Sequence, residues 1–312
     1  MISACLFQGL NWSEKSLKNY NIYEIDGECD GISLGNYLRG KLMLSRNSLI
    51  KIKKSGSLKV NGRGAYTDTI VKAGDKVEFE LPDRGSDNIL PEYMSLDIIF
   101  EDDHMIVVNK EADMPTHPSR NHYMGTLANG LMYHWMEKDR SITIRPVNRL
   151  DRNTSGLVLF AKSSHVQHLM SRESYKDKIT KEYLAVVQGR PEDDSGTIDA
   201  PIARESLRSI KRVVREGGAR AVTHYRVIER YEDYSLLGII LDTGRTHQIR
   251  VHMAYLGHPL LGDDLYGGSQ KKINRHALHA YNIKMLHPIE GTMLDFTAEP
   301  PPDMQKLIRK YS

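Results

Sequence analysis

The chain of 312 residues has few of the features that mark several large classes of protein. Its two cysteines, Cys5 and Cys29, are too few for a disulfide framework and lack the paired spacing of a metal site. No apolar run approaches the ~20 residues of a membrane span. The first twenty residues lack the basic and apolar regions of a signal peptide. We therefore expect a cytoplasmic protein with reduced thiols and no membrane association.

Common catalytic motifs are also absent. The sequence contains no phosphate-binding loop, no dinucleotide fingerprint and no Gly-x-Ser-x-Gly elbow. The pair His247 and His252, like the pair His276 and His279, has no accompanying glutamate in a metalloprotease arrangement. We expect no metal and interpret these histidines as structural hydrogen-bonding groups. The net charge of +3 permits nucleic-acid binding without requiring it, so RNA contacts would come from local basic clusters.

The composition divides the chain into two parts, and its length is typical of about two domains. Residues 1–82 contain a polar lead with a predicted strand over 20–25, followed by a compact unit over 31–82. The Pro, Gly, Asp, Ser and Asn content of 83–91 predicts a linker. Residues 92–312 form the larger part.

Two short helices and a strand are predicted in the compact unit. Ser33 can cap one helix, and Ser45 can cap a second helix that Gly56 would end. In DKVEFELP, apolar and charged residues alternate, which predicts a half-buried strand after a shorter strand in SLKVNG.

Basic and amide side chains gather on the second helix and the turn beyond it. They suit an RNA backbone, although a solvated helix face would carry the same charges. The order of Ser-Arg, Gly, Val-Asn-Gly and Gly-Asp elements resembles the small alpha-L RNA-binding module of ribosome-associated proteins. The resemblance implies RNA contacts through Arg46, Lys53, Lys54, Asn61 and Arg63.

Strands dominate the predicted structure of residues 92–312. Apolar patterns predict a hairpin over LDIIFEDDHMIVVNK, strands over 156–162, 181–190, 221–231 and 234–244, and helices over 164–176 and 245–257. The helices do not alternate strictly with strands. This order favours an α+β fold with a mixed, largely antiparallel sheet flanked by helices.

A polar loop runs directly into an apolar strand in RPVNRLDRNTSGLVLFAK (145–162). It places Asp151 near Arg149 and Arg152, whose positive charges favour an ionised carboxylate. In a water-poor site, such a carboxylate can act as a nucleophile or as a general base. The residues alone leave a structural salt bridge or a turn-capping aspartate as alternatives.

The same region carries ordered motifs that resemble those of the RluA-type pseudouridine synthases. RLDRNTSG followed by an apolar strand resembles their catalytic signature. The further motifs are NKEADMPTHP (109–118), KEYLAVVQG (181–189), GRTHQIRVHMAYLGHPLLGDDLYG (244–267), RHALHAYNIKMLHP (275–288) and AEPPPDM (298–304). Together they span about residues 97–304.

The resemblance implies isomerisation of uridine in structured RNA without a cofactor. By the same resemblance, Asp151 attacks or deprotonates at the target nucleoside, Tyr183 stacks on the uracil, and Arg245 pairs with Asp151. We interpret Asp263 and Asp264 as loop or helix-capping residues.

Two positions depart from the family's pattern. Glu111 stands where proline is usual, and Asn148 stands where histidine is usual. Asparagine can form hydrogen bonds but cannot transfer a proton. We therefore expect position 148 to be structural.

The target base must leave its stack, so other side chains must hold the RNA around it. Candidates lie near the catalytic loop and in 204–221, the densest basic run of the chain, for which a solvated loop is the alternative. They are His117, Arg120, Arg149, Arg208, Arg212 and Arg215. The order of the two units is typical of enzymes that modify large-subunit ribosomal RNA. Transfer RNA is the other candidate substrate, and we expect a monomer.

Two other functions fit parts of this pattern. A ribosome-associated binding protein would keep the basic clusters but would not need Asp151, Tyr183 and Arg245 together. A carboxylate-based glycosidase normally places two carboxylates around one bond, and the motifs supply only one. The combination of motifs therefore favours a pseudouridine synthase.

Overall fold

A computed structural model describes residues 20–44, 46–80, 89–119, 122–136 and 144–308. Ser45 and Arg120, which we predicted to cap a helix and to bind RNA, lie outside these ranges. Within them, no helix combines the length and the apolar character needed to cross a membrane.

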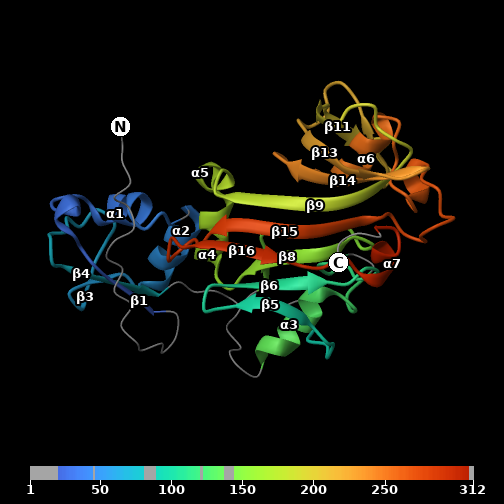
Figure 1. Ribbon diagram of the computed structural model, residues 1–312. Coiled ribbons are helices and arrows are strands. Elements are labelled where there is room, and N and C mark those ends of the chain that lie inside the picture. Colours follow the sequence, from blue (N-terminus) through green and yellow to red (C-terminus); the bar gives the residue numbers. More distant parts are fainter. Residues whose placement is uncertain (1–19, 45, 81–88, 120–121, 137–143, 309–312) are drawn as a thin grey trace.

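Residues 20–80 fold around a hydrophobic core of their own (blue in Figure 1). Their antiparallel sheet has the order β1 (Tyr20–Glu24), β4 (Lys76–Glu80), β2 (Lys59–Val60) and β3 (Arg63–Gly64). The helical elements are η1 (Gly27–Cys29), α1 (Leu34–Gly40) and α2 (Arg46–Ser55). Val77 and Phe79 of β4 are buried together with Leu38 of α1 and Ile52 of α2, so both helices pack on one face of the sheet.

The predicted start of α1 and the predicted end of α2 are confirmed. The Ser33 hydroxyl accepts a hydrogen bond from the Asn36 amide, which is the expected N-cap. Gly56 follows α2 with a φ of +64°, a conformation that favours glycine after a helix. The alternation predicted for β4 is also confirmed by its burial pattern.

The larger part is built on one long, mixed β-sheet (Figure 1). In the described residues its order is β10-β13-β14-β9-β15-β8-β6-β5, with β16 on β15 and β7 on β8. The pair β8–β15 is parallel and the other pairs are antiparallel, which confirms the predicted α+β class. The strands are β5 (Asp97–Glu101), β6 (Met105–Lys110), β7 (Arg145–Pro146), β8 (Ser155–Ala161), β9 (Ile179–Gln188), β10 (Ser195–Asp199), β13 (Val222–Arg230), β14 (Tyr234–Leu241), β15 (Leu278–Leu286) and β16 (Met293–Thr297).

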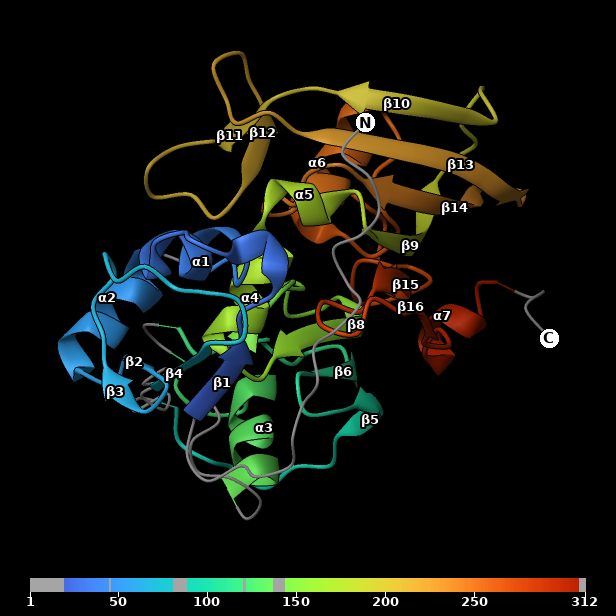
Figure 2. The ribbon, with the colours of Figure 1, turned by 90° about the vertical axis from the view of Figure 1, so that its left-hand side faces the viewer.

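Helices cover both faces of this sheet. Leu131 and Trp135 of α3 pack with Val108 of β6, whereas Val166 of α4 packs with Val107. Adjacent residues of a strand point to opposite faces, so the two helices cover opposite sides of the sheet. A separate two-stranded ribbon, β11–β12, projects away from the main sheet (Figure 2). These elements are α3 (Leu127–Met136), α4 (Ser164–Ser171), α5 (Glu173–Lys176), β11 (Ile202–Arg204), β12 (Arg212–Val214), α6 (Gln248–Tyr255), η2 (Asp264–Tyr266) and α7 (Pro302–Gln305).

Several elements differ from the sequence-based expectation. The helix predicted over 164–176 is broken at Arg172, whose extended backbone separates α4 from α5. The helix predicted from residue 245 begins only at Gln248, because His247 has a left-handed φ of +58°. Ile89, which was expected to lie in the linker over 83–91, is buried in the core cluster that also contains α3. The larger part therefore begins before residue 92.

Gly156 is the second residue of β8, just after the polar loop that contains Asp151. Its φ is +110°, and a Cβ at this position would lie 2.3 Å from the Ala280 carbonyl oxygen of β15. This close approach allows β8 and β15 to pair at Ser155–His279 and Gly156–Ala280. Glycine is therefore required for both the backbone conformation and the contact.

We predict that Gly156→Ala lowers the free energy of unfolding by about 2–4 kcal/mol, because it adds backbone strain to a steric overlap. Urea titration followed by circular dichroism measures the change. Gly244→Ala is the matched control, since a Cβ at Gly244 meets nothing within 4 Å. Equal stability of the two variants would contradict the prediction.

Candidate active site

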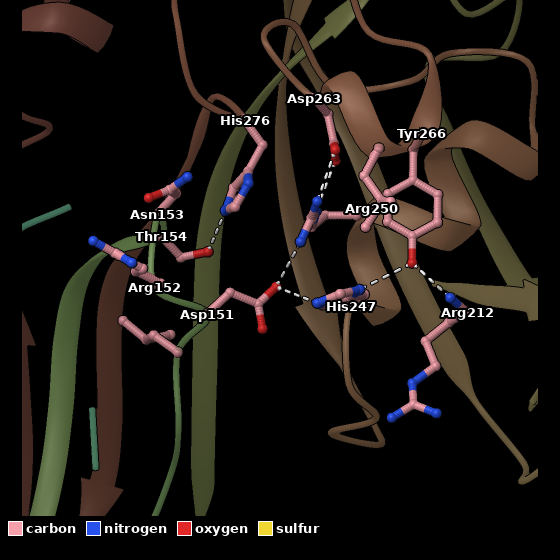
Figure 3. A network of polar contacts seen from close by, with 12 residues as sticks. Asp151, Arg152, Asn153, Thr154, Arg212, His247, Arg250, Asp263, Tyr266 and His276 are labelled. Atoms are coloured by element: carbon pink, nitrogen blue, oxygen red, sulfur yellow. Dashed lines mark hydrogen bonds and ion pairs between the residues drawn. The ribbon is translucent and has the colours of Figure 1, made fainter. Parts of the chain in front are cut away.

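Asp151 lies in the loop between β7 and β8, with its side chain 27% exposed. Arg250 of α6 donates a hydrogen bond from Nη1 to Asp151 Oδ2 at 3.2 Å (Figure 3). The two residues are 99 positions apart: Asp151 precedes β8 and Arg250 follows β14, which lie in different halves of the large sheet. The carboxylate is therefore held by a cation while it stays open to a ligand.

Arg250 is itself fixed by a second carboxylate. Its Nε and Nη2 donate to Asp263 Oδ2 and Oδ1 at 2.7 and 2.8 Å, a bidentate pair. The Asp263 side chain is 0% exposed and that of Arg250 is 8% exposed. Burial opposes the charged form of Arg250, but the bonds and charge of Asp263 outweigh it and raise the Arg250 pKa. The remaining guanidinium nitrogen, Nη1, therefore points at Asp151 from a side chain that Asp263 holds in place.

His247 forms the other polar side of the site. Its Nε2 lies 3.7 Å from Asp151 Oδ2, and its Nδ1 lies 3.0 Å from the Tyr266 hydroxyl. Because that hydroxyl accepts a hydrogen bond from the Arg212 amide, its own proton is available for His247 Nδ1. Burial lowers the pKa of His247. We therefore assign a neutral imidazole with its proton on Nε2, facing Asp151.

Neutral histidines also hold the far end of the loop. His276 Nε2 and Thr154 Oγ1 are 2.8 Å apart, and burial, with Arg250 nearby, lowers the His276 pKa to about 2. His279 bonds Ser155 through Nδ1 and the Ala298 carbonyl through Nε2. These contacts agree with the structural role expected for His276 and His279.

Lys110 ties two loops together beneath the site. Its ammonium donates to the backbone carbonyls of Glu111, Met114 and Arg152 at 2.7, 2.8 and 3.0 Å. Burial lowers its pKa to about 7. The lysine belongs to a motif recognised in the sequence, but its role was not predicted.

Asn148 has the structural contacts expected for this position. Its side chain donates to the Leu157 carbonyl at 3.2 Å and accepts from the Leu159 amide at 2.8 Å. These bonds hold the start of the loop against β8 and require no proton transfer.

Tyr183 of β9 is 7% exposed and belongs to the core cluster that Leu150 also contacts. Burial raises the pKa of its hydroxyl to about 12, with a further contribution from the charge of Asp151. The tyrosine is therefore neutral and close enough to Asp151 to be affected by its charge.

The predicted ion pair between Arg245 and Asp151 is wrong. Arg245 is exposed, and its Nε donates to the Arg220 carbonyl at 2.9 Å. Because α6 begins at Gln248, Arg250 is the arginine whose side chain reaches the carboxylate. Asp263 lies in the loop before η2, as expected, but its side chain forms no capping hydrogen bond and pairs with Arg250 instead.

The arginines beside Asp151 in the sequence do not pair with it. Arg152 forms an exposed ion pair with Asp113 at 2.8 Å, and Arg149 is exposed. His117 is half-buried, and its Nδ1 lies 3.3 Å from the Pro118 carbonyl oxygen.

The candidates for RNA binding in the smaller part separate into two kinds. Asn61 bonds Asp75 and the Lys76 amide through its side chain, so it stabilises the turn. The exposed side chains that remain are those of Arg46, Lys53, Lys54 and Arg63.

The basic run over 204–221 begins at the last residue of β11 and includes β12, so it is not an irregular loop alone. Arg208 is exposed, and Arg215 donates to the carbonyls of Arg204 and Glu205. The Arg212 backbone bonds Tyr266, which connects the ribbon to the site.

The arrangement supplies one accessible carboxylate, held by a permanent cation and surrounded by neutral rings. Asp263 cannot flank a bond in a substrate, because it is fully buried and bonded to Arg250. The two accessible carboxylates of a glycosidase are therefore not provided by this network.

Comparisons with known proteins agree on one family. The family model for RNA pseudouridylate synthase matches residues 104–255. The RNA pseudouridine synthase YhcT of Bacillus subtilis is 39% identical over 92% of this chain and 96% of its own length. Ribosomal large subunit pseudouridine synthase D of Zymomonas mobilis is 40% identical over 85% of this chain and 89% of its own. The structure of human RNA Pseudouridylate Synthase Domain Containing 1 matches 67% of this chain and 86% of its own, with 27% identity and a TM-score of 0.54.

We predict that Arg250→Met lowers the free energy of unfolding by about 3–5 kcal/mol, because it leaves Asp263 buried without a partner. Urea titration measures the loss. The double variant Arg250→Met, Asp263→Leu should recover most of it, since it removes the buried charge as well.

The matched control is Arg226→Met, which removes an arginine from the more exposed ion pair with Glu182. It should change stability by at most about 1 kcal/mol. A similarly small effect of Arg250→Met would show that Asp263 does not depend on it.

Proposed function

The chain belongs to the RluA-type RNA pseudouridine synthases, and on that premise we propose that it isomerises uridine in large-subunit ribosomal RNA through the carboxylate of Asp151. The name of the Zymomonas mobilis relative supports ribosomal RNA as the substrate. Transfer RNA is the alternative that the experiment below separates. The enzyme would act as a monomer in the cytoplasm, where both RNAs are available.

The reaction breaks the bond between C1′ and N1 of uridine and joins C1′ to C5 of the same base. N1 gains a proton and C5 loses one, so no electrons or atoms are exchanged with a cofactor. The chemistry needs a carboxylate that can attack or accept a proton, and a pocket that keeps the detached base in place.

The observation that carries the proposal is the arrangement of Asp151, Arg250 and Asp263. The buried ion pair fixes the guanidinium, and the guanidinium fixes and stabilises the Asp151 carboxylate. Asp151 is also the member of this triad with an exposed face. Such a carboxylate needs little rearrangement when the nucleoside arrives.

Tyr183 is proposed to hold the uracil while it turns. Its neutral ring lies near Asp151 and is rigidly packed, which suits stacking on a base. Arg245 and Arg149 are exposed close to the loop and helix that carry the site, and we propose them as contacts to backbone phosphates.

We propose that residues 1–82 form a separate RNA-anchoring domain of the alpha-L type. Its buried side chains form a cluster distinct from those of the larger part. Four exposed basic side chains, Arg46, Lys53, Lys54 and Arg63, can contact phosphates.

Asp151→Asn should fold normally and lose pseudouridine formation, because an amide can neither attack as a carboxylate nor accept the proton. Pseudouridine is mapped by selective chemical labelling and reverse-transcription stops in total RNA from cells with and without the protein. A site lost from large-subunit ribosomal RNA should return with the original chain and not with Asp151→Asn.

Asp264→Asn is the matched control. This carboxylate follows Asp263 in the sequence, is exposed, and accepts a hydrogen bond from the Leu265 amide rather than from Arg250. This variant should restore the site. Restoration by Asp151→Asn would remove Asp151 from the mechanism, and a site found only in transfer RNA would overturn the ribosomal assignment.

Removing residues 1–82 should weaken binding to an unmodified large-subunit rRNA transcript and make its salt dependence shallower, by about one to three in the slope of log K against log salt. Filter binding at several salt concentrations measures both. Replacing Arg46, Lys53, Lys54 and Arg63 by glutamine in the intact chain should reproduce the change. Unchanged affinity and slope in either protein would show that this part does not anchor the RNA.

A further inference from the structure

The loop that connects β11 to β12, residues 205–211, presents two large aliphatic side chains to solvent. Leu207 is 93% exposed, the highest value among the large hydrophobic residues of the described chain, and Ile210 is 75% exposed. Single exposed aliphatic residues are common and need no explanation. Leu207 and Ile210 do require an explanation, because they lie three positions apart on one structured loop beside the candidate active site.

Hydrogen bonds hold the loop in shape. The Glu205 amide donates to the Lys211 carbonyl at 3.1 Å, and Ser209 bonds Glu205 and Ser206. The Arg215 guanidinium donates to the carbonyls of Arg204 and Glu205 at its base. The aliphatic side chains are therefore presented on a preformed loop, which lowers the entropic cost of binding.

The ribbon is fastened to the catalytic network. The Arg212 amide, at the start of β12, bonds the Tyr266 hydroxyl at 2.9 Å, and Tyr266 in turn bonds His247 next to Asp151 (Figure 3). Figure 2 shows the ribbon projecting from the body of the protein. The loop therefore extends outward from the edge of the site, where RNA flanking the target would lie.

The charges around the loop select an anionic partner. Residues 204–220 contain six basic and two acidic side chains. Arg208 is exposed and Arg212 is half-buried, so both side chains can meet an anion at the surface. A partner with closely spaced phosphates and flat apolar surfaces between them is an RNA with unstacked bases.

We propose that Leu207 and Ile210 form an apolar wedge that packs against the bases next to the target uridine. The wedge fills the space left when the uridine turns out of its stack, while Arg208 and Arg212 hold the flanking phosphates. Proteins that unstack bases commonly insert aliphatic side chains in this way. This inference rests on the proposed function and adds a part of the chain that holds the substrate open.

The test compares Leu207→Ser, Ile210→Ser with the original chain on an unmodified large-subunit rRNA transcript. We expect kcat/KM for pseudouridine formation to fall about tenfold, since two aliphatic side chains lose their burial. The salt slope of binding should not change, because no charge is removed. Arg208→Ala should instead make the slope shallower by about one.

Met293→Ser is the matched control, because Met293 is 70% exposed on β16, away from the ribbon. It should leave kcat/KM unchanged. The melting temperature of all variants should equal that of the original chain, as the substituted side chains are exposed.

A direct readout uses the same RNA with 2-aminopurine beside the mapped uridine, bound to proteins that also carry Asp151→Asn. Its fluorescence should rise on binding, and the rise should be much smaller when Leu207 and Ile210 are serine. Equal fluorescence and equal kcat/KM would overturn the wedge. So would a change in sedimentation of the free protein without an effect on RNA, since the patch would then bind protein.

The original chain is measured in the same assays, so failure of the proposed function can be distinguished from failure of the wedge proposal. Absence of pseudouridine with every protein would overturn the proposed function and the wedge with it. Full activity of both the original chain and the serine variant would overturn the wedge alone.

Discussion

The candidate active site depends on the buried guanidinium of Arg250, which bridges two carboxylates of different exposure. Removing these charges from water is costly, and the bidentate contact with Asp263 offsets that cost while it fixes the guanidinium plane. One guanidinium nitrogen, Nη1, then remains to donate to Asp151. The exposed carboxylate therefore acquires a defined position from a pair that no substrate can reach.

The large sheet supplies the second constraint, because it must bring the Asp151 loop to α6. Gly156 permits the parallel contact of β8 with β15, the point where the two halves of the sheet join. Lys110, Asn148 and His276 each hold another part of the loop by bonding the backbone or a side chain. Arg250 stabilises a carboxylate whose position is already restricted by its own loop.

Much of this fold could be predicted, and the failures have physical causes. Strands with apolar runs or alternation, such as β4 and β8, were identified from the sequence. The central strand β15 was not, because His279, Asn282 and Lys284 interrupt its apolar residues, so the sequence shows neither an apolar run nor alternation. The choice between Arg245 and Arg250 depended on the left-handed backbone at His247, which delays the helix by three residues. Asp263 resembled a cap because its partner lies on another element.

The electrostatic design of the site also explains why its substrate can be a polyanion. His247 and His276 are held neutral by burial, so the positive charge in contact with Asp151 comes from an arginine that stays protonated at all physiological pH values. The reaction leaves the net charge of the nucleoside unchanged. The site therefore needs no titrating group to balance charge, and the remaining exposed arginines of the loop and ribbon are available for phosphates. A histidine at position 148 would add nothing to this balance, which is consistent with an asparagine that bonds only the backbone.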